Sequence, residues 1–149
     1  MSRIRAIAIR NRPRVAMQSI DSARIDIASG ILGDFRGSQR DRQVTILSES
    51  AWQRACDEVG AELPWTVRRA NLLVDGIEFD DSYIGKRVRI GEAELQITEE
   101  TDPCTRMDEQ HPGLTAALEP EWRGGVCCRV LKAGDIRLGD AVEIANGDS

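Results

Sequence analysis

Short segments of alternating polar and apolar residues, separated by glycine-containing turns, run through most of this chain of 149 residues. The clearest pair is Arg87–Ile90 and Ala93–Thr98, which flank Gly91-Glu92 as the two arms of a β-hairpin. Many short strands at close spacing can satisfy their edges by closing on themselves. The sequence therefore predicts a mainly β fold, a closed or nearly closed β-barrel. Further strands are predicted at Ile4–Ile9, Ala23–Ile27, Gln43–Leu47, Asn71–Val74, Gly125–Leu131 and Ala141–Ile144.

One longer helix is expected within this β-rich chain, over about Glu49–Val59, because apolar residues recur there at i, i+3, i+4 and i+7. Ser48 or Ser50 can cap its start and Gly60 can end it. Cys56 falls on the apolar face of this helix and is read as a small core residue. Short helical turns are predicted at 105–110 and 114–118, and non-helical turns at 133–135 and 138–140.

The composition favours a globular protein and argues against some partners and sites. The net charge is -5, from 20 basic and 25 acidic residues, which argues against broad nucleic-acid binding. Only Lys86 and Lys132 are lysines, so nearly all the cations are arginines, which grip phosphate and carboxylate groups in bidentate fashion. His111 is the only histidine, so neither a Ser-His-Asp triad nor a multi-histidine metal site is expected.

The expected organisation is a single domain over residues 1–149, in the cytoplasm and without membrane contact. No apolar run approaches the ~18–20 residues that span a bilayer, and the first residues lack the apolar stretch of a signal peptide. The reducing cytoplasm then follows as the expected location.

Cys104 is the residue best placed for chemistry. It follows Pro103 at the expected end of a strand and precedes Arg106, whose positive charge favours thiolate over thiol. A thiolate attacks electrophiles and binds soft metals, whereas a buried, inert thiol is the structural alternative. The other cysteines form no CxxC pair, and Cys127 and Cys128 should point to opposite faces of a strand. Neither a zinc knuckle nor a dithiol redox motif is indicated.

Three basic segments are candidates for binding an anion. Arg68-Arg69-Ala70-Asn71 leads into an apolar strand, so at least one guanidinium is expected near a barrel rim. Asp34–Arg42 is a basic, glycine-containing loop that could hold a phosphate, although it lacks the P-loop pattern. Arg123-Gly124-Gly125 allows the backbone to approach a ligand or another strand closely. The structural alternatives are a solvated strand start, a surface loop and a β-bulge or tight turn.

Taken in order, these segments resemble the MOSC domain, which is the C-terminal domain of molybdenum cofactor sulfurases and also occurs as stand-alone bacterial proteins. The resemblance covers the chain from about residue 15 to residue 144. It is carried by Gly30-Ile31-Leu32-Gly33-Asp34, the basic loop, Gln43–Leu47, Arg69-Ala70-Asn71-Leu72, Gly85, Ile90–Ala93, Pro103-Cys104, Arg123-Gly124-Gly125, Gly134-Asp135-Ile136 and Gly139-Asp140.

The resemblance implies a MOSC-type β-barrel with a few short helices. It also implies binding of the molybdenum cofactor (molybdopterin), a pterin with a terminal phosphate and a metal held by a dithiolene. The family cysteine either ligates molybdenum or carries sulfur to it, and Cys104 occupies that position. The implied cofactor-binding residues are Arg36, Arg40, Arg42, Arg69, Asn71, Arg106 and Arg123.

The implied function is reduction of N-hydroxylated compounds, or transfer of sulfur or cofactor, and whether the protein is an enzyme stays open. The chain carries no pyridoxal-phosphate cysteine-desulfurase module and no flavin or iron–sulfur domain. A separate electron donor or a cysteine desulfurase would therefore be its partner. The alternative is a non-catalytic β-barrel ligand-binding or interaction module that has lost the cofactor.

Overall fold

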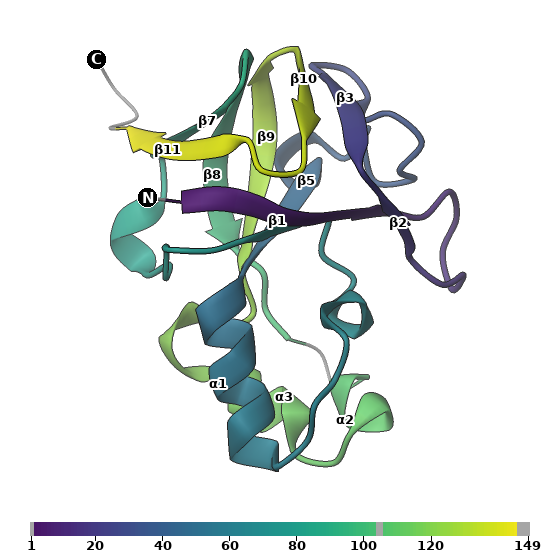
Figure 1. Ribbon diagram of the computed structural model, residues 1–149, viewed down its shortest axis with the longest axis vertical. Helices are drawn as coiled ribbons and strands as arrows, with labels where there is room; N and C mark the ends of the chain where they lie inside the picture. Colours follow the sequence, from purple (N-terminus) through teal and green to yellow (C-terminus); the bar gives the residue numbers. More distant parts are fainter. Residues whose placement is uncertain (1, 104–105, 146–149) are drawn as a thin grey trace.

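The computed structural model describes residues 2–103 and 106–145, and these residues are arranged mainly in β-strands (Figure 1). The strands are β1 Ser2–Ile9, β2 Gln18–Ile20, β3 Ser22–Asp26, β4 Gly30–Ile31, β5 Val44–Ser48, β6 Leu72–Val74, β7 Arg87–Ile90, β8 Ala93–Glu100, β9 Val126–Lys132, β10 Gly134–Arg137 and β11 Ala141–Ala145. The α-helices are α1 Glu49–Val59, α2 Met107–Gln110 and α3 Leu114–Leu118. The 3-10 helices are η1 Arg40–Arg42, η2 Trp65–Arg68, η3 Asp81–Tyr83 and η4 Pro120–Trp122.

Seven of the described strands close into a barrel in the order β11-β7-β8-β9-β5-β6-β1. Pairing of Ser2 with Val142 and of Arg3 with Ala141 joins the first strand to the last and removes the sheet edges there. The pairs are antiparallel except for β5 and β6, which run parallel on either side of α1 in the chain. The expected mainly β barrel with few short helices is confirmed, as is the predicted hairpin of β7 and β8.

Two hydrophobic cores account for the arrangement of barrel and helices. The inward faces of the strands form the first core, in which Ile46 and Cys128 are fully buried. The second core lies between the outer face of the barrel and the helices, and it contains Leu47 together with Trp52 and Leu118. Because consecutive residues of a strand face opposite sides, β5 is buried along its whole length. Figure 1 shows α1, α2 and α3 gathered at one end of the barrel.

The α1 helix has the predicted bounds and caps. The Ser48 hydroxyl accepts a hydrogen bond from the Ala51 N–H at 3.3 Å, which satisfies one of the free donors of the first turn. Gly60 ends the helix in the left-handed conformation, with φ 71°. Cys56 is buried in the second core, as its position in the pattern indicated.

The turn predicted at 133–135 is wrong, because Gly134–Arg137 forms β10. This strand pairs with β3, Gly134 opposite Ile25 and Arg137 opposite Ser22, in a small sheet completed by β4. Gly134 is read as a turn residue from sequence, but a Cβ at this position would lie 2.4 Å from the Ala93 nitrogen. The glycine therefore permits a close approach of two backbones rather than a reversal of the chain.

None of the helices in the described part of the chain is long and apolar enough to cross a membrane.

Candidate functional site

An open pocket of about 760 Å³ lies where the ends of several barrel strands meet η2 and α2. Strand-end residues line one side of the pocket, and residues at the start of α2 line another. The lining residues are Arg10, Pro13, Arg14, Phe35, Arg36, Gln39, Arg42, Thr45, Arg68, Arg69, Thr101, Arg106, Met107, Glu109, Gln110 and Cys127.

The pocket concentrates positive charge within an acidic protein. Seven of these described lining residues are arginines, and Glu109 is the single carboxylate among them. Two of the seven have protein partners: Arg42 pairs with Glu99, and Arg68 bonds to backbone oxygens. The other five form no ion pair within residues 2–103 and 106–145, namely Arg10, Arg14, Arg36, Arg69 and Arg106. A pocket lined in this way favours an anionic ligand.

Arg10 is the buried centre of this charge, with 5% of its surface exposed. Its guanidinium carbon lies 4.8 Å from the centroid of the Phe35 ring, and that of Arg36 lies 5.4 Å from the same centroid. No described protein group accepts a hydrogen bond from its buried Nη1 atom. Burial, together with the charges of Arg69 and Arg36, lowers the pKa of Arg10 to about 10 against the opposing effect of Asp34.

Two pocket arginines have a strained backbone. Arg69 has φ 65° and Arg14 has φ 66°, in the left-handed region that favours glycine. Such a conformation costs on the order of 1 kcal/mol for a residue with a Cβ and persists only where the surroundings hold it. Arg69 is held directly after η2, where its N–H donates to the Thr66 carbonyl at 3.0 Å. Strain of this kind is typical of ligand-binding segments.

The remaining wall carries a thiol. Cys127 Sγ lies 3.1 Å from Thr101 Oγ1, and Arg42 Nε donates to Glu99 at 2.5 Å beside them. Burial raises the pKa of the Cys127 thiol, although the Thr101 contact and nearby arginines act in the opposite direction. Cys128 faces the barrel core instead, as the alternation of a strand predicted.

Asn71 lies beneath the pocket wall and is itself 3% exposed. Its Oδ1 accepts hydrogen bonds from the Thr45 N–H at 3.0 Å and the Thr45 hydroxyl at 3.2 Å, and its Nδ2 donates to the Ala8 carbonyl at 3.2 Å. Thr45 lines the pocket, whereas Asn71 does not. The Asn71 amide therefore joins β1, β5 and the start of β6, and it holds Thr45 in place at the pocket wall.

Comparison with known proteins gives the family directly, since the profile of the MOSC domain matches residues 32–143 of the chain. The chain belongs to the MOSC domain family. This family is generally linked to molybdenum cofactor binding and sulfur transfer. No curated protein sequence matches the chain.

Several solved structures share the MOSC fold of this chain. YuaD from Bacillus subtilis has a TM-score of 0.80 at 20% identity, with 99% of this chain and 98% of that chain covered. YiiM from Geobacillus stearothermophilus has a TM-score of 0.77 at 17% identity, covering 98% of this chain and 76% of that chain. YiiM from Escherichia coli has a TM-score of 0.74 at 17% identity, covering 99% and 71%. At these identities the likeness shows the fold alone.

The MOSC barrel brings together four of the residues predicted to bind the cofactor. These four line the pocket: Arg36, Arg42, Arg69 and Arg106. Arg40 lies on η1 and is exposed outside the lining. Cys104, the predicted metal ligand or sulfur carrier, lies outside the described residues. Thr101 and Arg106, on either side of it in the chain, both line the pocket.

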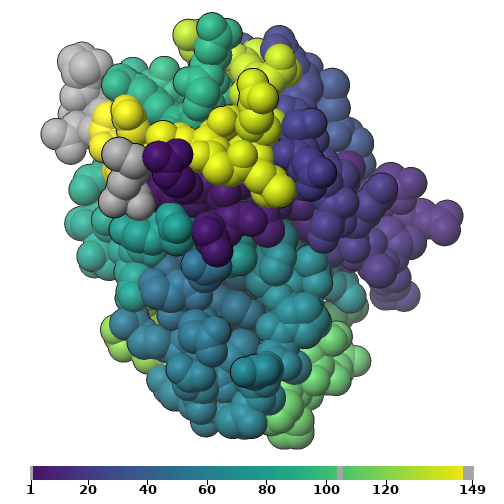
Figure 2. All heavy atoms as spheres, in the orientation of Figure 1, coloured from purple at the N-terminus to yellow at the C-terminus, as the bar shows by residue number. Residues whose placement is uncertain are grey.

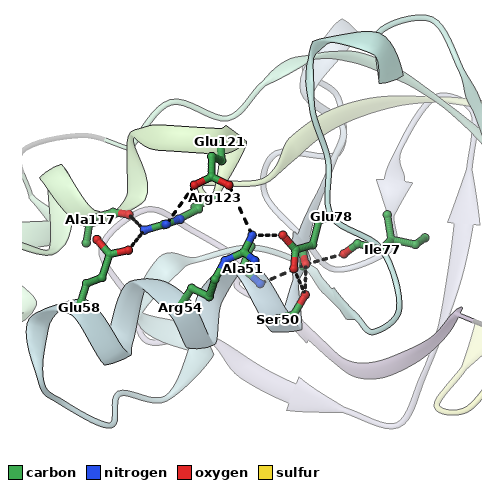
Figure 3. Close-up of polar contacts among 10 residues, drawn as sticks. Ser50, Ala51, Arg54, Glu58, Ile77, Glu78, Ala117, Glu121 and Arg123 are labelled. Carbon is green, nitrogen blue, oxygen red and sulfur yellow. Dashed lines mark hydrogen bonds and ion pairs between the residues drawn. The ribbon is translucent and has the colours of Figure 1, made fainter.

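Arg123 lies in a separate ion network along one side of α1 (Figure 3). Its guanidinium is buried and donates to Glu58, to the Ala117 carbonyl at 3.1 Å and to Glu121 at 3.2 Å. Glu121 in turn lies 3.8 Å from Arg54, which pairs with Glu78. This network ties α1 to η4 and lies outside the pocket lining.

The two glycines after Arg123 serve backbone packing. A Cβ on Gly124 would lie 2.4 Å from the Thr101 oxygen, and one on Gly125 would lie 2.4 Å from the Ile46 oxygen. Close approach to another strand is observed, and so is the tight turn of the structural alternative, because the Gly125 N–H donates to the Trp122 carbonyl at 3.1 Å. Arg68 donates to the Gly124 carbonyl at 3.1 Å and to the Thr101 carbonyl at 2.8 Å, so it braces the same crossing.

Sequence reasoning missed Arg10, Arg14 and Cys127 as pocket residues. Arg10 and Arg14 follow the first strand, and the chain between β1 and β2 protrudes from one side of the molecule (Figure 2). Their one sequence signal is the arginine at every second position from residue 10 to residue 14. For Cys127, alternation along the strand predicted that its side chain lies on the face opposite to that of Cys128, but it did not predict that this face borders a pocket.

Proposed function

We propose that this protein binds the molybdenum cofactor in the arginine-lined pocket and uses it to reduce N-hydroxylated compounds. The observation that supports binding is the set of five arginines without an ion-pair partner in the described chain, around the buried Nη1 of Arg10. A terminal phosphate carries about two negative charges and offers several acceptor oxygens, so it suits this set.

The residues present fit the cofactor at its anionic end. Arg10, Arg36 and Arg69 would hold the phosphate, because Arg69 and Arg36 are the cations that act on Arg10 most strongly. Arg42 and Arg106, also implied by the family resemblance, line the same pocket. Asn71 and Arg123 would support the site through the fold rather than by contact, and Arg40 would contribute only its charge.

The metal end of the cofactor is assigned to Cys104. No group of three or more His, Cys, Asp or Glu side chains that could hold a metal occurs among residues 2–103 and 106–145. A soft thiolate suits a thiophilic metal, and the chain on both sides of Cys104 borders the pocket. Cys104 would serve as molybdenum ligand in a reductase and as the sulfur-bearing atom in a carrier.

The bound cofactor would supply two-electron redox chemistry. Reduction of an N-hydroxylated compound consumes two electrons and two protons, cleaves the N–O bond and releases water and the reduced nitrogen compound. The electrons would come from a separate donor. The protein's own residues would bind the phosphate, orient the substrate beside the metal and exclude water from the inner pocket. The protein would act in the cytoplasm, where reducing conditions keep thiols free and electron donors are available.

Metal and pterin content test the binding step. The protein should be isolated from a molybdate-replete host, with molybdenum measured by mass spectrometry and pterin by fluorescence after oxidation. Near-stoichiometric cofactor is expected for wild type and for Arg89→Gln, an exposed control on β7. At least a tenfold loss is expected for Arg69→Gln, and loss of metal for Cys104→Ala. Wild-type protein that holds no cofactor and takes up none when it is added would refute the proposal.

Reduction of benzamidoxime with an artificial electron donor tests the reductase role. Amidine formation that needs both cofactor and Cys104 supports the reductase. Cofactor-loaded protein that forms no amidine but accepts sulfur from a cysteine desulfurase would instead identify a carrier.

A further inference from the structure

The pocket contains more unpaired positive charge than one phosphate can neutralise. Its five unpaired arginines face one lining carboxylate, Glu109, and one carboxylate outside the lining, Asp34, that acts on Arg10. A phosphate monoester compensates about two of those charges. Like charges crowded together destabilise the fold unless a ligand compensates them. The excess therefore points to a second anionic group in the same pocket.

The five arginines fall into an inner and an outer group. Arg10, Arg36 and Arg69 are buried or half-buried and act on one another, as the lowered pKa of Arg10 shows. Arg14 and Arg106 are exposed, and neither forms an ion pair with another described residue. We call Arg14 and Arg106 the rim pair. One follows β1 and the other directly precedes α2, so two separate segments carry them to the same pocket.

The inner arginines are suited to an anionic group of a tightly bound cofactor. The guanidinium groups of Arg10 and Arg36 lie over the Phe35 ring, and Arg10 is buried. The rim pair is suited to a group that comes and goes, because exposed charges attract a ligand at long range and release it readily. The neutral amides of Gln39 and Gln110 also line the pocket and can bond to uncharged parts of such a ligand.

We propose that the substrate of this protein carries an anionic group of its own, a phosphate or a carboxylate, which the rim pair Arg14 and Arg106 binds. This inference rests on the proposed function, in which the inner group holds the cofactor phosphate. The strained φ of 66° at Arg14 is in keeping with a residue held in place for a ligand.

The test compares three probes that differ in one substituent: benzamidoxime, 4-carboxybenzamidoxime and 4-(phosphonooxy)benzamidoxime. Their binding to the isolated, cofactor-loaded protein is measured by calorimetry at constant ionic strength. A charge-assisted hydrogen bond to arginine should make at least one anionic probe bind about tenfold more tightly than the neutral one. The preference should shrink as salt is raised from 50 to 300 mM. The carboxylate and phosphate probes show which of the two anions the rim prefers.

The variants Arg14→Gln and Arg106→Gln, and the two combined, locate the effect. The double variant, compared with wild type at equal cofactor content, should reduce the anionic preference to about twofold or less. The affinity of each protein for benzamidoxime, which carries no anion, is the reference for that preference. Arg89→Gln should retain the full preference. Equal affinities for all three probes in wild type, or a preference that survives the double variant, would overturn the inference.

Turnover separates the inference from the proposed function. Equal kcat/KM for the neutral and anionic probes contradicts the inference and leaves the reductase intact. A preference for anionic probes that depends on the rim pair, with no reduction of any probe, contradicts the reductase and supports the rim site. Protein that is isolated without cofactor contradicts the cofactor proposal, and the double variant still decides whether the rim binds the anion.

Discussion

Replacing Arg10 with methionine should stabilise the ligand-free protein while it abolishes phosphate binding. Arg10 is 5% exposed, has an unbonded Nη1 among the described residues and packs against Phe35. Methionine has a similar length, fills irregular spaces and carries no charge. The substitution therefore removes the electrostatic penalty and keeps most of the packing.

The magnitude follows from the lowered pKa. A shift from 12.5 to about 10 corresponds to at most about 3 kcal/mol against the charged form. The pocket is open to water, which screens this penalty to about 1–2 kcal/mol. Loss of the contact with the Phe35 ring offsets about 0.5–1 kcal/mol. The free energy of unfolding should rise by about 0.5–1 kcal/mol, and Tm by about 1–4 °C.

Urea and thermal unfolding, each with and without inorganic phosphate, provide the assay. Phosphate should raise the Tm of wild type and have little effect on Arg10→Met. Arg12→Met, an exposed neighbour outside the pocket lining, should change stability by less than 0.5 kcal/mol and keep the phosphate response.

The difference in unfolding free energy between wild type and Arg10→Met depends on pH because the pKa of Arg10 is lower in the folded protein. Arg10 is protonated in both the folded and the unfolded state below pH 10, so the difference should be constant from pH 6 to 9. Above a pH of about 10 the folded protein loses this proton first, and the penalty in wild type declines. An Arg10→Met variant that loses more than 1 kcal/mol would show that Arg10 is structural and refute the reasoning.

Three further predictions concern the frame around the pocket. Asn71→Ala should lower the free energy of unfolding by about 3 kcal/mol, because it leaves the buried partners of the amide unsatisfied; a loss under 1 kcal/mol in urea would contradict its bracing role. Gly125→Ala should lower the free energy of unfolding by about 2–4 kcal/mol, since its Cβ would lie 2.4 Å from the Ile46 oxygen. Gly60→Ala, with open space and φ 71°, should lower it by only about 1 kcal/mol. Equal losses of stability in the two variants would exclude the steric cause. In a Cys104→Ser variant, Cys127 should react with iodoacetamide slowly at pH 8 and faster only at higher pH, because burial raises the pKa of its thiol. Rapid alkylation of Cys127 at neutral pH would contradict that burial.

Much of the barrel could be predicted because its information is local. The β7–β8 hairpin shows alternation on both arms and a two-residue turn, and the bounds of α1 depend on a serine cap and a terminal glycine. The strand β10 was missed for the opposite reason. Its residues look like a turn, and they become a strand only because β3, more than 100 residues earlier, supplies the partner.

The candidate site was predictable in part. Arg36, Arg42, Arg69 and Arg106 came from the family resemblance, and the pocket contains them. Composition could not separate those arginines from Arg123, which is equally basic but is bound in a buried network with two glutamates. Cys104 stays a prediction, because it lies outside the described residues.

The sequence by itself determined the strand pattern and the helix, since each depends on residues close together in the chain, and its composition determined the excess of arginine over lysine. Only the tertiary structure decided which arginines share a pocket and which are already paired. A guanidinium looks the same in sequence whether its partner is a carboxylate, a carbonyl or an absent ligand. Closure of the barrel brings β1, the 34–42 loop, η2 and α2 to one end, and that closure gathers cations from separate segments into one arginine-lined pocket.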